Sequence, residues 1–126
     1  MVRNIPPLLF IILISTLAAS CSSKEPVGKL IVTEITESGT DGGRQEFCSG
    51  FTLSKNAAET FFEQAKPISV EKLHNSYDFL PCYTRGKALM GKEQCLWEIR
   101  AGNTGELTCG AKATKLLACD DCLPTP

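Results

Sequence analysis

The most reactive side chains in this sequence are its seven cysteines, two of which stand close together near the C-terminus. Cys119 and Cys122 enclose two aspartates, a spacing found in redox dithiols and in half of a zinc site. A redox dithiol is activated at a helix N-terminus, whereas Leu-Pro-Thr-Pro follows here and nearby carboxylates oppose thiolate formation. Zinc would need a second ligand pair, and the chain holds one histidine, His74. We therefore expect a structural disulfide role and no metal site, with a thiol oxidoreductase as the alternative.

Other candidates for chemistry are weaker. His74 lies in a polar stretch and is expected at the surface, so the sequence offers no clear base for a nucleophilic triad. Arg100 precedes the glycine-containing loop Ala-Gly-Asn-Thr-Gly, where its guanidinium is a possible binding group for a carboxylate. We prefer a structural interpretation of this segment, with Trp97 in the core, an exposed Glu-Arg strand face and a hairpin loop. Phosphate-binding and calcium-binding loop patterns are missing, which favours a non-enzymatic protein and leaves enzyme activity open.

The N-terminus carries a short apolar run. Arg3 is the only early charge, and residues 5–17 read Ile-Pro-Pro-Leu-Leu-Phe-Ile-Ile-Leu-Ile-Ser-Thr-Leu. This run is shorter than the about 20 apolar residues that a membrane-spanning helix needs, and it fits the apolar core of a secretory signal. Small residues follow directly before Cys21. Residues 17–21, Leu-Ala-Ala-Ser-Cys, resemble the lipobox of the bacterial lipoprotein signal family.

The resemblance implies how the chain is processed and where it resides. It implies cleavage after Ser20, diacylglycerol on the Cys21 sulfur and a further acyl chain such as palmitate, so that the membrane is a partner through the covalent lipid. No other cofactor is expected. Ser22, and not an aspartate, directly follows Cys21. In this respect the chain resembles Gram-negative lipoproteins that are sorted to the outer membrane. The chain then divides into a signal peptide at 1–20, a lipidated N-terminus and tether at 21–28, and a globular domain at 29–126.

Six cysteines remain when Cys21 carries lipid, and an even number in a small exported domain is typical of a disulfide framework. The sequence alone does not choose among the possible connectivities. If a loop at 101–103 joins two antiparallel strands, residue 100 faces residue 104 and Cys95 faces Cys109, which predicts one bridge. The others would form two bridges that tie the C-terminal tail to the domain. The six are Cys48, Cys82, Cys95, Cys109, Cys119 and Cys122.

Hydrophobic periodicity in the domain predicts one main helix and several strands. Ser54 is a good N-cap for the helix, and Pro67 ends it. The residues at 37–44 are expected to form a turn-rich loop that joins the first two strands as a hairpin. The order β-β-α-β-β-β-β predicts an α+β fold with the helix packed on an antiparallel sheet. Strands are expected over 29–36, 45–53, 82–90, 93–100, 106–109 and 113–118, a helix over 55–65 with a further turn at 69–74, and a core of Phe61, Phe62, Trp97, Ile99 and Leu107.

The charge balance bears on the choice of partner. Without Arg3, which lies in the signal peptide, the mature chain has 12 Lys and Arg against 14 Asp and Glu. A basic stripe is missing, so nucleic acid is excluded as a partner. These features favour a lipid-anchored protein of the bacterial cell envelope that binds another envelope protein or a cell-wall component without catalysis. An inhibitor or immunity-type lipoprotein and a small envelope enzyme remain as alternatives.

Overall fold

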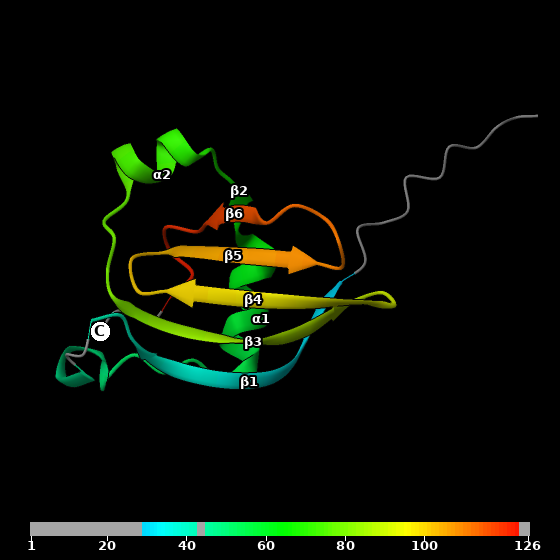
Figure 1. Cartoon of the computed structure of the whole chain (residues 1–126), viewed down its shortest axis with the longest axis horizontal. Coiled ribbons are helices and arrows are strands. Elements are labelled where there is room, and N and C mark those ends of the chain that lie inside the picture. The colour runs from blue at the N-terminus through cyan, green and yellow to red at the C-terminus, as the bar shows by residue number, and fades with distance from the viewer. Residues whose placement is uncertain (1–28, 43–44, 124–126) are drawn as a thin grey trace, which may run out of the picture.

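The computed structural model describes residues 29–42 and 45–123, so the predicted signal peptide and Cys21 lie outside the described residues. The described part holds a six-stranded antiparallel sheet in the order β1-β3-β4-β5-β6-β2, and α1 lies across one face of it (Figure 1). The predicted α+β class, with a helix packed on an antiparallel sheet, is confirmed. The elements are β1 (Leu30–Thr40), the 3-10 helix η1 (Gln45–Cys48), α1 (Lys55–Gln64), β2 (Lys66–Pro67), α2 (Val70–Ser76), β3 (Cys82–Met90), β4 (Glu93–Arg100), β5 (Thr104–Cys109) and β6 (Lys115–Ala118).

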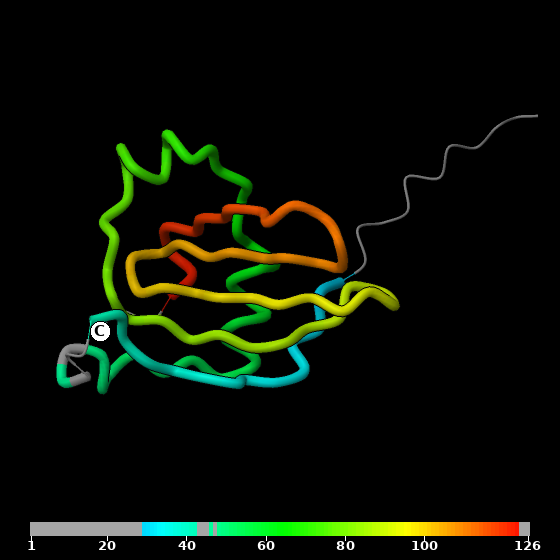
Figure 2. The backbone as a smooth tube through the Cα atoms, viewed as in Figure 1, coloured from blue at the N-terminus to red at the C-terminus, as the bar shows by residue number. Residues whose placement is uncertain are grey.

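The strands β3, β4 and β5 form the predicted meander. Gly91 occupies the turn between β3 and β4 with φ +62°, a left-handed conformation that favours glycine. The next turn places Arg100 opposite Thr104 and Cys95 opposite Cys109, as the sequence predicted. Cys95 and Cys109 are joined by a disulfide with a Cα–Cα distance of 4.0 Å. The path of the meander is continuous in Figure 2.

The start of the domain differs from the prediction. The predicted strand over 45–53 is wrong, because its first residues form η1, and the first strand is longer than expected and runs to Thr40. β1 pairs with β3 and not with residues 45–53, so its last residues find backbone partners in a strand distant in sequence. This pairing outweighs the turn-forming tendency of the Ser-Gly-Thr sequence at 38–40, since strand propensity depends strongly on context. Register shifts near residues 33 and 36 accommodate the curvature of β1.

The element order also differs from the predicted β-β-α-β-β-β-β. The two-residue strand β2 follows α1 and pairs with β6 at the edge of the sheet. The predicted turn at 69–74 is a second short helix, α2, with Ser69 as its N-cap. The last two strands are confirmed with shifted ends, since β5 begins at Thr104 and β6 at Lys115.

The core lies between α1 and the face of the sheet that α1 covers, which we call the inner face. Four of the five predicted core residues are buried: Phe61, Trp97, Ile99 and Leu107. Phe62 is partly buried and packs edge-on against Trp97, with ring centroids 6.1 Å apart. Gly86 lies beneath the Trp97 ring, where an added Cβ would also meet the Glu34 carbonyl oxygen. The absence of a side chain there lets the indole lie flat on the sheet.

The opposite face of the sheet, which we call the outer face, extends between two ends of the domain. The first residues of β1, the β3–β4 turn and the β5–β6 loop lie together at the right of Figure 1. We call this the tether end, because β1 begins there, directly after the predicted tether at 21–28 and Lys29. The β4–β5 turn and the segment joining α2 to β3 lie at the left, which we call the far end (Figure 1).

Candidate functional site

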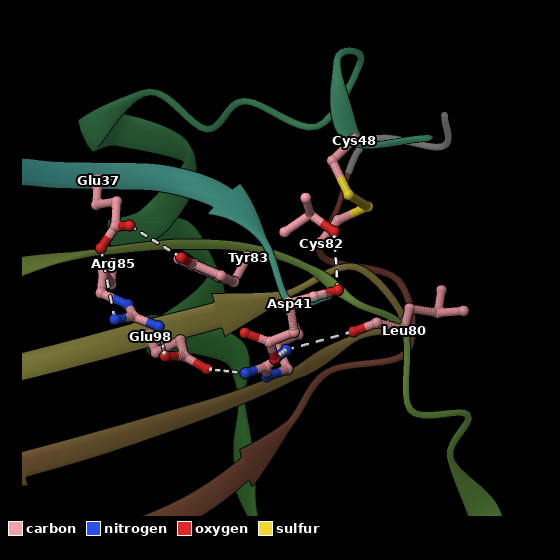
Figure 3. Close-up of polar contacts among 10 residues, drawn as sticks. Glu37, Asp41, Cys48, Leu80, Cys82, Tyr83, Arg85 and Glu98 are labelled. Carbon is pink, nitrogen blue, oxygen red and sulfur yellow. Dashed lines mark hydrogen bonds and ion pairs between the residues drawn. A yellow bond between two sulfur atoms is a disulfide. The ribbon is translucent and has the colours of Figure 1, made fainter. Parts of the chain in front are cut away.

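A group of charged and aromatic side chains occupies the outer face near the far end. The alternation of the strands places Tyr83 and Arg85 of β3 beside Arg100 and Glu98 of β4, on the side opposite the buried Thr84 and Ile99. β1 adds Glu37, which is opposite Arg85. The group is completed by Asp41, and we call these six residues the outer-face cluster (Figure 3): Glu37, Asp41, Tyr83, Arg85, Glu98 and Arg100.

The charges of the outer-face cluster alternate in a continuous chain. Arg85 lies 3.4 Å from a Glu37 oxygen and 3.1 Å from Glu98 Oε2. Glu98 Oε1 is 2.8 Å from Arg100 Nη2, and Arg100 Nη1 is 2.8 Å from Asp41 Oδ2. Three carboxylates therefore share two guanidinium groups, and Glu98 joins both arginines with separate oxygens. The arrangement neutralises most of its own charge.

Each of the two guanidinium groups lies over an aromatic ring. The Arg85 guanidinium carbon lies 4.1 Å from the centre of the Tyr83 ring, and that of Arg100 lies 4.7 Å from the centre of Phe79. Both distances fall within the range of a cation–π interaction. The Tyr83 hydroxyl donates a hydrogen bond of 2.9 Å to Glu37, which raises the pKa of Tyr83, with desolvation as a second cause. A phenolate beside Glu37 would bring two negative charges together, so the tyrosine stays protonated well into alkaline pH.

The outer-face cluster also fastens the chain before β3. Asp41 donates its backbone N–H to the Pro81 carbonyl at 3.0 Å, and Arg100 donates to the Leu80 carbonyl at 3.5 Å. A disulfide joins Cys48 to Cys82 directly beside these contacts (Figure 3). The contacts bring three segments far apart in sequence to one place, and they give the cluster a clear structural role.

Arg100 is therefore not an open binding group. Its side chain is 18% exposed and that of Glu98 is 19% exposed, so the expectation of an exposed Glu-Arg face is wrong. The Arg100 fork already meets two carboxylates, and a carboxylate ligand would have to displace the more exposed Asp41. The binding role of Arg100 stays a prediction, whereas its structural role is visible in these contacts.

Arg85 and β1 contribute to this cluster, although neither was expected there from the sequence. A turn at Gly91 and Lys92 sets the register of β3 and β4, and the same register places Arg85 opposite Glu98. That pair was accessible from sequence. The positions of Glu37 and Asp41 were not, because they depend on the pairing of β1 with β3.

The cysteines near the C-terminus are arranged differently from the prediction. Cys119 and Cys122 are bonded to each other, with a Cα–Cα distance of 5.5 Å, so they do not tie the tail to the rest of the domain. A short loop between two cysteines closes easily, which favours this local pairing over a distant one. Within this loop Asp120 accepts a hydrogen bond of 2.9 Å from the Tyr77 hydroxyl, and this bond raises the pKa of Tyr77. His74 is exposed in the last turn of α2, as expected.

Across residues 29–42 and 45–123, no group of three or more His, Cys, Asp and Glu side chains is placed to hold a metal ion. Within the same residues, none of the helices has the length and apolar character needed to cross a bilayer.

Comparison with protein-family models, with curated proteins and with solved structures finds no match for this chain.

Proposed function

We propose that this protein is a lipid-anchored module of the bacterial cell envelope that binds or supports an envelope component without catalysis. The observation that carries the proposal is the pairing of the cysteines. Six of the seven form three bridges within the domain, and the one that remains is Cys21 of the lipobox. Ser22 favours the outer membrane if the cell is Gram-negative.

The chemistry of the bridges supports an exported location. Disulfides persist in oxidising compartments, and cytosolic thiol systems keep cysteines reduced. A domain with three bridges therefore matures after export, which is the step that a signal peptide at 1–20 provides. Diacylglycerol and a further acyl chain on Cys21 would hold the mature chain at the membrane, since stable anchoring takes more than one chain.

A non-enzymatic role is supported by the outer-face cluster. Its carboxylates and guanidinium groups are paired with one another and fasten the fold. Carboxylates held in ion pairs of this kind stabilise a surface and leave little capacity for acid-base work. The partner is an envelope protein or a cell-wall component. An inhibitor or immunity-type lipoprotein is the same module with an enzyme or toxin as its partner.

A thiol oxidoreductase is the second candidate. It is favoured by the bond between Cys119 and Cys122, since neither cysteine is bridged to another part of the domain. A Cys-x-x-Cys pair bonded to itself is the arrangement that an exchanging dithiol uses. Turnover of insulin disulfides with a dithiol reductant would support this candidate. Activity equal to that of a Cys119→Ala/Cys122→Ala variant would reject it.

The anchoring proposal is tested by Cys21→Ser, with Ser23→Ala as the control. In the native bacterium, wild-type and Ser23→Ala proteins should give a mature, detergent-requiring species whose N-terminal peptide carries the mass of the lipid. Cys21→Ser should remain unprocessed or leave the membrane fraction. A mature, detergent-requiring Cys21→Ser protein would contradict the proposal.

A further inference from the structure

The outer face also carries an apolar patch, which begins at the tether end and reaches Leu96 in the middle of β4, two residues before Glu98. Ile31 of β1 is opposite Leu89 of β3. Leu89 pairs with Gln94 of β4, and Leu96 lies two residues after Gln94 on the same strand. Their neighbours in sequence Val32, Ala88 and Cys95 are buried on the inner face, so strand alternation turns these three side chains outward. We call Ile31, Leu89 and Leu96 the apolar patch.

The apolar patch is exposed and lies beside a depression. Ile31 is 53% exposed and Leu96 is 62% exposed, and both belong to strands whose alternate residues fill the core. The depression holds about 550 Å³, and Leu89, Leu96, Lys87 and Thr108 are among the residues that line it. Scattered apolar side chains are ordinary on a protein surface, but a contiguous group marks an interaction site.

The position of the patch relative to the anchor indicates what covers it. Ile31 is the second residue of β1, so the patch begins where the chain from Cys21 enters the sheet. In the predicted mature chain only nine residues, Cys21 to Lys29, precede β1. At about 3.3–3.6 Å per residue they reach at most about 30 Å, so the tether end stays close to the bilayer. A tethered surface meets its target at high effective concentration.

We propose that the apolar patch docks on the lipid surface and orients the domain with its far end away from the membrane. This inference rests on the proposed lipid anchor at Cys21. Exposed leucine and isoleucine side chains are suited to the boundary between headgroups and acyl chains. The docked patch would leave the exposed Phe79 at the far end accessible to an envelope partner.

The docking is driven mainly by apolar contact, because three of the lysines near the patch are paired with glutamates. Lys87 lies 3.8 Å from Glu34, and Lys112 lies 2.9 Å from Glu93. Lys29, next to β1, lies 3.7 Å from Glu63. Paired charges give little net attraction to anionic lipid, so docking is expected on neutral and anionic membranes alike.

Photocrosslinking in vesicles tests the inference with a matched pair of leucines. A photoreactive leucine analogue replaces Leu96 of the apolar patch or Leu80 of the far end, which is 41% exposed. The mature lipidated protein is reconstituted into phosphatidylcholine vesicles, with and without phosphatidylglycerol, and lipid adducts are measured by mass spectrometry. Position 96 should give several-fold more lipid adduct than position 80, with little dependence on phosphatidylglycerol.

A second variant pair tests the apolar contribution. With the analogue at position 31, Leu96→Glu should lower the lipid adduct several-fold, whereas Leu80→Glu should leave it unchanged. Urea unfolding confirms that both variants are folded, and Leu96→Lys replaces Leu96→Glu if the glutamate variant is not.

The remaining outcomes separate the two proposals. If the N-terminal peptide carries lipid and positions 96 and 80 label lipid equally, the docking inference is wrong and the anchor stands. Adducts at position 96 with a second copy or with the protein's own tether, in place of lipid, overturn the docking in favour of those occupants. An N-terminal peptide without lipid overturns both proposals.

Discussion

Glu98 links both arginines of the outer-face cluster, and it does so from a half-buried position. Its neighbour across the strand pair is Glu106, which is exposed. Both are outer-face glutamates at the same level of the sheet, yet their surroundings differ. The face of a strand on which a residue lies therefore does not determine how much that residue contributes to stability. The contribution also depends on the ion pairs that its side chain forms.

We expect Glu98→Ala to lower the free energy of unfolding by about 1–3 kcal/mol, because each of two guanidinium groups loses one of its two carboxylate partners. Glu106→Ala is the control and should change stability by no more than about 0.5 kcal/mol. It could stabilise the protein slightly, because it removes a like charge opposite Glu98. Urea unfolding followed by circular dichroism measures both, and equal effects would show that the Glu98 ion pairs contribute nothing.

Tyr83 provides a pH-dependent readout of the same cluster. Its raised pKa means that the folded state holds the phenolic proton more tightly than the unfolded state does. The stabilisation is fully present below the ordinary tyrosine pKa of about 10 and is lost as the pH rises through the raised value. Glu37→Gln should lower the pKa of Tyr83 towards the ordinary value, as measured by the ultraviolet absorbance of tyrosinate. The pKa of Tyr77, which Asp120 raises, is the internal control and should not move.

At the scale of elements, the two helices differ in how firmly they are held. Each begins at a serine whose hydroxyl accepts a backbone N–H, Ser54 from Ala57 and Ser69 from Lys72, both at 3.1 Å. α1 buries Ala58 and Phe61 in the core, whereas α2 contributes no fully buried residue. The same capping bond therefore supports a core element in one case and a peripheral one in the other.

Ser54→Ala should lower the free energy of unfolding by about 0.5–2 kcal/mol, which is the usual cost of losing an N-cap. Ser69→Ala should have a smaller effect on global unfolding, because α2 can fray without opening the core. Thermal or urea denaturation gives the comparison, and local fraying of α2 is visible as faster amide hydrogen exchange over residues 70–76. A larger loss of stability from Ser69→Ala would contradict this account.

At the scale of the whole molecule, the three bridges restrict the unfolded chain to different extents. The Cys48–Cys82 bridge spans 34 residues in sequence and the Cys119–Cys122 bridge spans only three. Chain entropy predicts that a longer closed loop stabilises more. The long bridge also fastens the segment before β3 beside the outer-face cluster, so its removal affects the fold at a distance.

Replacing Cys48 and Cys82 together by alanine should cost about 4 kcal/mol, and replacing Cys119 and Cys122 about 2 kcal/mol. Urea unfolding under non-reducing conditions measures both double variants. Peptide mapping of the unreduced wild-type protein tests the connectivity itself. Stability losses in the opposite order would show that strain or residual structure outweighs loop length.

Local signals in the sequence predicted much of the fold correctly. The Ser54 cap began α1, and two short turns fixed the register of β3, β4 and β5 and with it the Cys95–Cys109 bridge. These features depend on residues close together in the chain, where turn length and side-chain alternation leave few alternatives. The lipobox is a local signal of the same kind, and it stays a prediction.

Only the tertiary structure decided the partner of β1, the pair Cys48–Cys82 and the assembly of the outer-face cluster. Residues 37–40 read as a turn by composition, and they became strand because β3 offered them backbone partners. The same pairing brought Glu37 beside Arg85. Long-range pairing gains its free energy from contacts between distant segments, and local propensity contains no information about which segments will meet.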